Sequence, residues 1–240
     1  MTDPVVEAID VVKWLGTGAA QVQALKGVSL ALRGGELMLL MGPSGSGKTT
    51  LLSVLGCMLT PTGGTVRLGG RSTEGAGPEE LARIRREHVG FIFQSYHLFP
   101  TLTATDNVRL ALDVRGENSA RAVTKAKDAL AMVGLAHKTN AFPLELSGGE
   151  QQRVAIARAI VGHPSAVLAD EPTASLDGEN GNAIMKLLAE IAKDSSRGVL
   201  VVAHDTRILP FADRVVHIED GRIVSEERGT REERGSVRQA

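Results

Sequence analysis

The sequence predicts an α/β fold built around a mostly parallel β-sheet. Short apolar runs alternate along the chain with stretches whose apolar residues recur at helical spacing. This alternation is typical of strand–helix–strand units. The runs at 37–41, 166–169 and 199–203 contain apolar residues only, as strands buried on both faces of a sheet do.

Two further segments predict antiparallel strands beside this parallel core. Residues 66–68 alternate in polarity just before the glycine pair at 69–70. Residues 215–218 are separated from 222–224 by a short turn at 219–221. Both patterns are hairpin signals. We therefore expect the core to carry flanking antiparallel strands, including an N-terminal antiparallel β subdomain.

The stretch from about 95 to 160 changes to helical patterns, which are broken by Gly134, Pro143 and the glycine pair at 148–149. We interpret it as an α-helical subdomain inserted into one main domain that covers residues 1–225. Residues 226–240 mix Glu and Arg with almost no apolar residue. That composition predicts a charged, flexible tail.

Composition narrows the class of protein. The 240 residues are 42% hydrophobic and 23% charged, which is typical of a soluble globular protein. A net charge of −1 argues against nucleic acid as a partner. The single cysteine, Cys57, lies in an apolar run, so we expect a buried thiol, no disulfide within the chain and a reducing compartment.

No membrane or export segment is expected from the sequence. The start of the chain, residues 1–4, has neither the basic region nor the apolar core of a signal peptide. The longest apolar runs fall far short of the roughly 18 residues that a spanning helix needs. Any connection to a membrane is therefore expected to run through a partner.

A phosphate-binding loop is predicted at 42–49, which matches G-x-x-x-x-G-K-[ST] between a predicted strand and a helical pattern at 48–58. Glycines let backbone N–H groups turn toward phosphates, and the helix start adds partial positive charge. Lys48 is placed to reach the β- and γ-phosphates, and Thr49 to offer its hydroxyl to Mg²⁺. The expected nucleotide-binding residues are Gly42, Pro43, Ser44, Gly45, Ser46, Gly47, Lys48, Thr49 and Thr50.

Two adjacent acids follow the apolar run at 166–169. Neighbouring carboxylates at the end of a buried strand repel each other and lose hydration, and a metal ion would relieve both costs. We assign Asp170 to Mg²⁺, directly or through water. We assign Glu171 to the attacking water as general base.

The segment 146–153, Leu-Ser-Gly-Gly-Glu-Gln-Gln-Arg, resembles the signature of ABC-type ATPases. Ser147, Gly148 and Gly149 open a helical pattern whose positive end can bind a γ-phosphate. In one chain this would duplicate the phosphate loop. Its use therefore makes most sense across a dimer, whereas a plain helix cap would explain Ser147 but not the two glycines.

Other stretches resemble the rest of that family in the expected order, over about residues 5–224. Residues 91–94 resemble the Q-loop, which implies that Gln94 contacts Mg²⁺ or the attacking water. Residues 174–177 resemble the D-loop, which implies that Asp177 touches the phosphate loop of the opposite subunit. Residues 201–205 resemble the switch strand, which implies that His204 contacts the γ-phosphate, orders the water and, with Glu171, Gln94 and Lys48, takes part in hydrolysis.

The resemblance implies a P-loop NTPase (RecA-like) core that uses ATP and Mg²⁺ and forms a head-to-tail dimer of two copies. It also implies a separate integral membrane permease, a peripheral location on the cytoplasmic face of the inner (plasma) membrane, and a periplasmic adaptor reached through the permease. Residues 95–104 and 142–145 are similar to the lipoprotein-releasing and macrolide-export branch, although amino-acid importers share much of this pattern. The apolar stretch 96–100 is a candidate contact for a permease helix, with local packing as the alternative.

One position departs from the family pattern. The family usually stacks adenine on an aromatic residue just before a glycine of the N-terminal strand. Here Leu15 precedes Gly16, and the only tryptophan, Trp14, lies one residue earlier. Successive strand residues face opposite sides. Trp14 is therefore expected to stack only if the strand is bulged or its register shifted, and otherwise Leu15 makes an apolar contact.

Two other classes of protein fit the sequence less well. Soluble ABC ATPases of DNA repair or translation usually carry long coiled coils, zinc modules or duplicated domains, and this sequence has none of those signals. A scaffold with vestigial activity would not need Lys48, Asp170, Glu171 and His204 together. The sequence therefore predicts the ATPase subunit of a transport complex, for export or for lipid or lipoprotein extraction.

Overall fold

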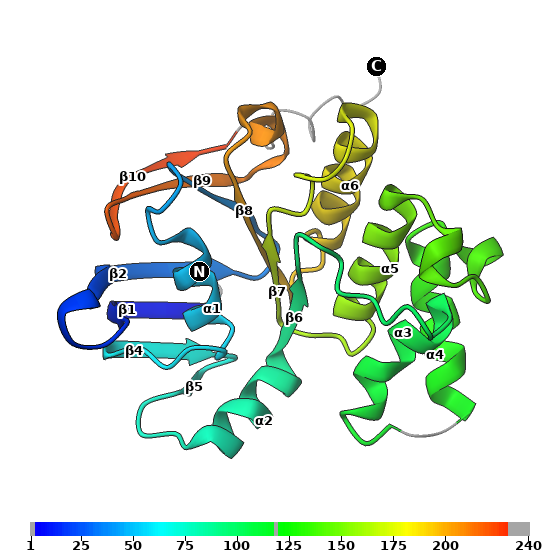
Figure 1. Cartoon of the computed structure of the whole chain (residues 1–240), viewed down its shortest axis with the longest axis horizontal. Coiled ribbons are helices and arrows are strands. Elements are labelled where there is room, and N and C mark those ends of the chain that lie inside the picture. Colours follow the sequence, from blue (N-terminus) through cyan, green and yellow to red (C-terminus); the bar gives the residue numbers. More distant parts are fainter. Residues whose placement is uncertain (1–2, 118–119, 230–240) are drawn as a thin grey trace.

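The computed structural model describes residues 3–117 and 120–229 and contains two β-sheets (Figure 1). The larger sheet has the strand order β10-β9-β3-β8-β7-β6. Its strands from β9 to β6 are parallel, and β10 pairs antiparallel with β9. The expected parallel core and the second hairpin are therefore confirmed. The bounds are β3 Leu37–Met41, β6 Val89–Ile92, β7 Ala166–Asp170, β8 Gly198–Ala203, β9 Arg214–Glu219 and β10 Arg222–Arg228.

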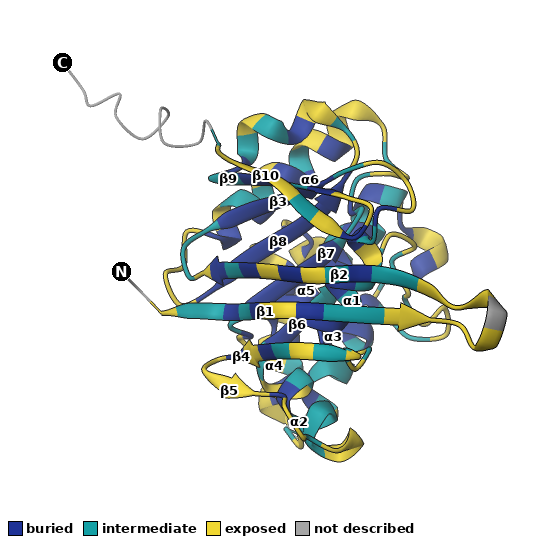
Figure 2. Cartoon of the chain, turned by 90° about the vertical axis from the view of Figure 1, so that its left-hand side faces the viewer, coloured by how far each residue is buried: buried dark blue, intermediate teal, exposed yellow. Residues whose placement is uncertain are grey.

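The central strand β3 is buried because its two faces meet different hydrophobic cores. Leu37, Leu39 and Met41 belong to the core on the helical side of the sheet. Met38 and Leu40 belong to the core toward the smaller sheet. Figure 2 shows the central strands as the most buried part of the molecule. Burial on both faces explains why the sequence of β3 is a continuous apolar run with no alternation.

The smaller sheet is antiparallel and has the order β2-β1-β4-β5, which confirms the N-terminal antiparallel β subdomain. Helix α1 lies between the two sheets, against β1, β2, β4, β7 and β8 (Figure 1). Helix α1 is thereby held between the two sheets. The bounds are β1 Pro4–Leu15, β2 Val22–Arg33, β4 Gly63–Leu68, β5 Arg71–Ser72 and α1 Lys48–Leu55, with the 3₁₀ helix η1 at Gly18–Ala20.

The remaining helices cover the other face of the large sheet or extend beside it (Figure 1). Helices α3, α4 and α5 pack against one another, and α5 also contacts β6 and α6. They occupy the stretch expected to form a helical subdomain, whose limits at about 95 and 160 stay a prediction. The bounds are α2 Pro78–His88, α3 Ala104–Asp113, α4 Ala120–Met132, η2 Ala136–Lys138, η3 Pro143–Glu145, α5 Gly148–Ile160, α6 Gly178–Ile191 and η4 Thr206–Phe211.

Two boundaries differ from the sequence pattern. Helix α1 ends at Leu55 although the helical pattern continues to Met58. The reason is that Cys57, buried as expected, has a left-handed φ of 54° that a helix cannot include. At the other end, β10 continues to Arg228 and so includes the start of the expected tail, whose residues 230–240 lie outside the described part of the chain.

In the part of the chain that the structure describes, every helix is too short or too polar to cross a lipid bilayer.

Candidate active site

Three of the predicted motifs, namely the phosphate loop, the two acids after 166–169 and the switch strand, meet at one edge of the large sheet. Strands β3, β7 and β8 are parallel neighbours, so their carboxyl ends lie together. Gly42 follows β3, Glu171 follows β7 and His204 follows β8. A cavity of about 820 Å³ opens at this edge. Its described lining consists of Leu15, Val22, Gln23, Ala24, Gly42, Pro43, Ser44, Gly45, Gly47, Lys48, Thr49, Thr50, Glu171, His204, Asp220 and Gly221.

The phosphate loop is packed so closely that two of its glycines cannot be replaced without displacing backbone. A Cβ atom on Gly42 would lie 2.1 Å from the carbonyl oxygen of Ile218. A Cβ atom on Gly47 would lie 2.7 Å from the carbonyl oxygen of Ala24, and the φ of Gly47 is 103°. The loop is thus held between β2 and the β9–β10 hairpin.

Lys48 opens helix α1 and is 7% exposed. Its Nζ donates hydrogen bonds to the carbonyl oxygens of Gly42 at 2.8 Å and Pro43 at 2.7 Å. The loop therefore folds around its own lysine. The ammonium group and the start of α1 make this end of the cavity positive, as an anion site requires.

Two of the residues expected to hold Mg²⁺, Thr49 and Asp170, carry oxygen donors that suit that ion. The Thr49 hydroxyl donates to Asp170 Oδ1 at 3.2 Å, which joins the phosphate loop to the end of β7. Burial raises the pKa of Asp170, the neighbouring Glu171 raises it further, and Thr49 and Lys48 oppose the shift. A hydroxyl and a carboxylate are hard oxygen donors. Mg²⁺ typically takes one or two of these from the protein and the rest from phosphates and water.

Glu171 and His204 form a pair across the ends of β7 and β8. Glu171 Oε1 lies 3.2 Å from His204 Nδ1, whose N–H it can accept. The backbone N–H of Glu171 donates to Val202 at 3.0 Å, and its φ of 47° is left-handed. A non-glycine residue held in that region is strained and is found mainly at functional sites. Glu171 and His204 both line the cavity, where an acid and an imidazole can act on one water.

The far end of the cavity is lined by residues of β1 and β2. Leu15 lines the cavity together with Val22, whereas Trp14 is absent from its described lining. Strand β1 is irregular against β2 between Lys13 and Trp14. That shift does not bring Trp14 round to the cavity, because Leu15, the next residue along the strand, takes that side.

The signature residues lie elsewhere on the chain and outside the described cavity lining. Ser147 caps α5: its Oγ accepts from the N–H of Glu150 at 3.3 Å, and Glu150 accepts from the N–H of Ser147 at 2.8 Å. Contacts within the chain also favour glycine at positions 148 and 149. A Cβ on Gly148 would lie 3.0 Å from the Tyr96 hydroxyl, and one on Gly149 would lie 2.8 Å from Asn180 Oδ1.

Gln94 and Asp177 also lie outside the described cavity lining. Gln94 is exposed two residues beyond β6, whose carboxyl end lies next to that of β7. Asp177 caps α6, where it accepts from the N–H of Asn180 at 2.9 Å and from its side-chain amide at 2.7 Å. These hydrogen bonds lower the pKa of Asp177.

Part of the cavity wall was not predicted from the sequence. Val22, Gln23 and Ala24 line it from β2, and Asp220 and Gly221 from the β9–β10 turn. Backbone hydrogen bonds hold that turn in place: the N–H of Gly221 donates to the carbonyl of Ser46 at 3.0 Å, and the carbonyl of Gly221 accepts from Lys26 at 2.8 Å. The turn signal was visible in the sequence, but its contact with the phosphate loop was not.

The sequence is similar to known proteins over most of its length. The family model described as ABC transporter matches residues 25–174. The macrolide export ATP-binding/permease protein MacB of Salmonella choleraesuis (strain SC-B67) is 43% identical over 208 residues, which cover 87% of this chain and 32% of that protein. MacB of Escherichia coli (strain K12) is 41% identical over 221 residues, 92% of this chain and 34% of that protein. The chain thus spans about a third of the length of these curated relatives.

Solved structures match over nearly the whole chain. The dimeric post-hydrolysis state of the ATP-binding cassette MJ0796 with ADP and Pi has a TM-score of 0.84 and 40% identity, and covers 93% of this chain and 98% of that chain. CbiO1 from Clostridium perfringens, part of the ABC transporter complex cbiONQ, has a TM-score of 0.83 at 26% identity, over 98% of this chain and 92% of that chain. The fold class expected from the sequence is therefore confirmed.

Proposed function

The chain belongs to the ABC transporter family, and from this premise we propose that it binds ATP with Mg²⁺ and hydrolyses it as one half of a head-to-tail dimer. The observation that carries the proposal is the convergence of Lys48, Thr49, Glu171 and His204 on one cavity. Asp170 joins them through its hydrogen bond with Thr49. Phosphate binding, metal binding and water activation are thereby brought to one edge of the sheet.

The phosphate end of ATP would take over contacts that the loop now makes with itself. Lys48 Nζ would exchange the carbonyl oxygens of Gly42 and Pro43 for the β- and γ-phosphates, since an ammonium binds anionic oxygen more strongly than a neutral carbonyl. Thr49 and Asp170, with Gln94 from the neighbouring strand end, would hold Mg²⁺. The metal, when bound, neutralises charge on the phosphates.

The Glu171 carboxylate would accept a proton from the attacking water, and His204 would orient that water and contact the γ-phosphate. The 3.2 Å separation of Glu171 Oε1 and His204 Nδ1 allows both groups to reach one small molecule. The backbone of Glu171 is held at the end of β7 by its hydrogen bond to the carbonyl oxygen of Val202.

A second copy of the chain would complete the site. Ser147 is exposed at the start of α5, where the N–H groups and the helix dipole favour an anion. With Gly148 and Gly149 it would close over the γ-phosphate bound by the other copy, and Asp177 would contact that copy's phosphate loop. The dimeric state of the similar cassette MJ0796 supports this arrangement. Loss of the γ-phosphate would let the dimer open.

The base end of the site would bind adenine by apolar contact with Leu15 and Val22, and not by stacking on Trp14. We expect Leu15→Ala to weaken ATP binding about fivefold, since it removes roughly 1 kcal/mol of apolar contact. The matched control Trp14→Ala should change the affinity less than twofold. Calorimetric titration with Mg-ATP compares them, and a larger loss in Trp14→Ala would return the base contact to the tryptophan.

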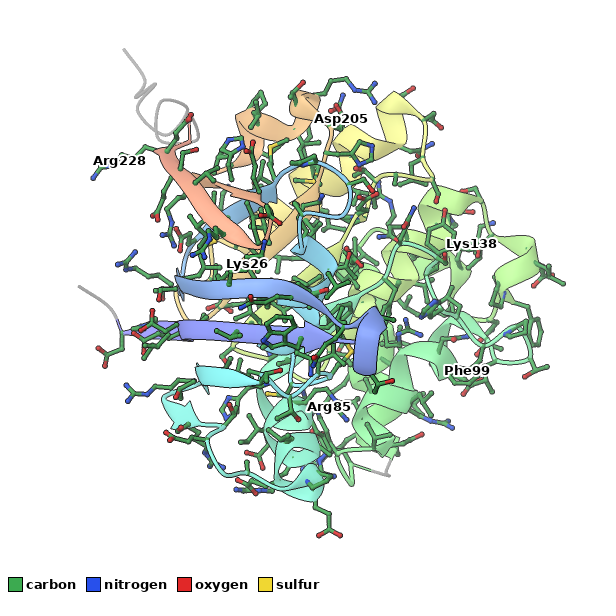
Figure 3. All side chains as sticks on the ribbon, turned by 60° about the vertical axis from the view of Figure 1, so that its left-hand side comes forward. Lys26, Arg85, Phe99, Lys138, Asp205 and Arg228 are labelled. Atoms are coloured by element: carbon green, nitrogen blue, oxygen red, sulfur yellow. The ribbon has the colours of Figure 1, made fainter. Side chains whose placement is uncertain are left out.

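We further propose that the dimer drives an integral membrane permease from the cytoplasmic face of the inner membrane, for export or for lipid or lipoprotein extraction, with a periplasmic adaptor reached through the permease. The relatives named MacB join an ATP-binding part to a permease in one longer protein, which supports a permease partner. The segment after Gln94 exposes an apolar side chain, Phe99, at 50% (Figure 3). It is a candidate contact for the permease.

The test uses tagged Glu171→Gln protein held closed with ATP in its native host. The dimer is isolated separately from mild-detergent membrane extracts and from cytosol, and its companions are identified by mass spectrometry. A permease with a large extracytoplasmic domain supports the proposal and its branch. A permease of many spanning helices keeps transport and overturns the branch. Soluble companions alone would favour a role in DNA repair or translation.

A further inference from the structure

An acidic side chain lies in the helical turn that the proposed function assigns to a phosphate. Glu150 is the third residue of α5, and its Oε2 accepts the N–H of Ser147 at 2.8 Å. This hydrogen bond lowers the pKa of Glu150, and the positive charge of Lys138 lowers it further. The carboxylate is therefore ionised at neutral pH. Since a γ-phosphate is negative as well, a carboxylate in the same turn opposes its binding.

The opposite charge comes from Lys138, which is labelled in Figure 3. This lysine is the last residue of η2, and its Nζ lies 3.6 Å from Glu150 Oε1. Among the ion pairs of the described residues, it is the one cation paired with Glu150. The side chains of Lys138 and Glu150 are 33% and 26% exposed, so water screens their attraction only in part. Lys138 therefore offsets the charge of Glu150 at the start of α5.

Helix α5 also helps to hold the segment that carries Lys138. Arg153, one turn further along the helix, donates to the carbonyl oxygen of Val133 at 3.1 Å. The N–H of Lys138 donates to the carbonyl oxygen of Leu135 at 3.0 Å. The segment 133–138 is thus tied to α5 at both ends. We therefore expect Lys138 to stay beside Glu150 when α5 approaches a second copy of the chain.

A second acid lies near the same helix start. Asp177 accepts hydrogen bonds from the N–H and the side-chain amide of Asn180. A Cβ atom on Gly149 would lie 2.8 Å from Asn180 Oδ1, so the loop before α6 packs against the signature glycines. Two carboxylates therefore flank the position expected for the γ-phosphate, and Lys138 compensates the one in α5.

We propose that Lys138 is a positioning residue of the nucleotide-bridged dimer, because by neutralising Glu150 it lets the start of α5 bind the γ-phosphate held by the second copy. The inference rests on the proposed function. Lys138 lies outside the described lining of the cavity, so its charge should have little effect on nucleotide bound within one chain. Its effect is expected when α5 of one copy closes over the phosphate of the other.

The test compares Lys138→Met with Lys193→Met, both in the Glu171→Gln background. Lys193 is the matched control, because its Nζ also pairs with a glutamate, Glu190 Oε1, at 2.7 Å on the exposed end of another helix. We expect Lys138→Met to weaken the ATP-dependent dimer about 25-fold, which is about fivefold at each of its two phosphate sites. Lys193→Met should leave the dimer unchanged. Analytical ultracentrifugation with ATP measures the dissociation constants.

Two further changes separate charge from packing. Lys138→Arg keeps the charge, so the dimer should form as in the parent. Glu150→Gln removes the negative charge and keeps the cap, since glutamine also accepts the N–H of the capping serine. When it is combined with Glu150→Gln, Lys138→Met should weaken the dimer less than twofold. Calorimetric titration with Mg-ADP should give the same affinity for every variant, which shows that each one folds.

Equal dimer dissociation constants for Lys138→Met and Lys193→Met would overturn this inference alone. Equal weakening by Lys138→Met with and without Glu150→Gln would also overturn it, and would assign the lysine to the packing of η2. If the Glu171→Gln parent failed to dimerise with ATP, the proposed function itself would be wrong, and with it the site on which Lys138 acts.

Discussion

Replacing Glu171 with Gln is expected to lower the rate of ATP hydrolysis by about 10²–10⁴-fold, the usual contribution of a positioned general base. The amide keeps the shape of the side chain and cannot accept the proton of the attacking water. ATP binding and dimer formation should persist, because Lys48 and Thr49 are untouched. Phosphate release measures the first effect, and analytical ultracentrifugation with ATP measures the second.

The matched control is Glu179→Gln, which changes an exposed acid in the first turn of α6. It should hydrolyse ATP at the unmodified rate. If the turnover of Glu171→Gln equalled that of this control, the assignment of Glu171 as the base would be wrong, and another group would have to activate the water.

Lys48→Ala is expected to weaken ATP binding about a hundredfold, since charge-assisted hydrogen bonds contribute about 1.5–3 kcal/mol. The lysine is the cation that the loop encloses, and two carbonyl oxygens now hold it beside the cavity. Without it the phosphates would meet backbone N–H groups and the helix dipole alone. Titration with a fluorescent ATP analogue measures the change in affinity.

The control for this variant is Lys127→Ala, which removes an exposed lysine of α4 and should bind ATP normally. Thermal unfolding of both variants checks that the fold is retained. Unaltered ATP affinity in Lys48→Ala would contradict the proposed phosphate site.

Several strands and turns could be predicted from the sequence because the patterns that indicate them lie within a few neighbouring residues. The apolar run 37–41 predicted a strand buried on both faces, and β3 has alternate residues in two cores. The hairpin at 215–224 followed from alternation around a turn, and β9 and β10 pair there. A strand buried on both faces, or a tight turn, restricts the residues that can form it, so neighbouring residues are enough to identify it.

Other features depended on contacts between distant segments. The sequence left open whether Trp14 or Leu15 faces the cavity, and the described lining contains Leu15. The turn at Gly221 became part of the cavity because it hydrogen-bonds to Ser46, far away in sequence. No periodicity within either segment encodes such a contact, since it depends on how two sheets pack around α1.

By itself the sequence determined the parallel core, the phosphate loop and the acids at the end of β7. Each is specified by residues that adjoin one another and must satisfy the same backbone geometry. Only the tertiary structure decided which residues close the base end of the cavity and that Glu171 meets His204. It alone placed Lys138 of η2 beside Glu150 of α5. The physical reason is that the charge and shape of a site come from residues on several segments of the chain. Only folding sets the distances between those segments.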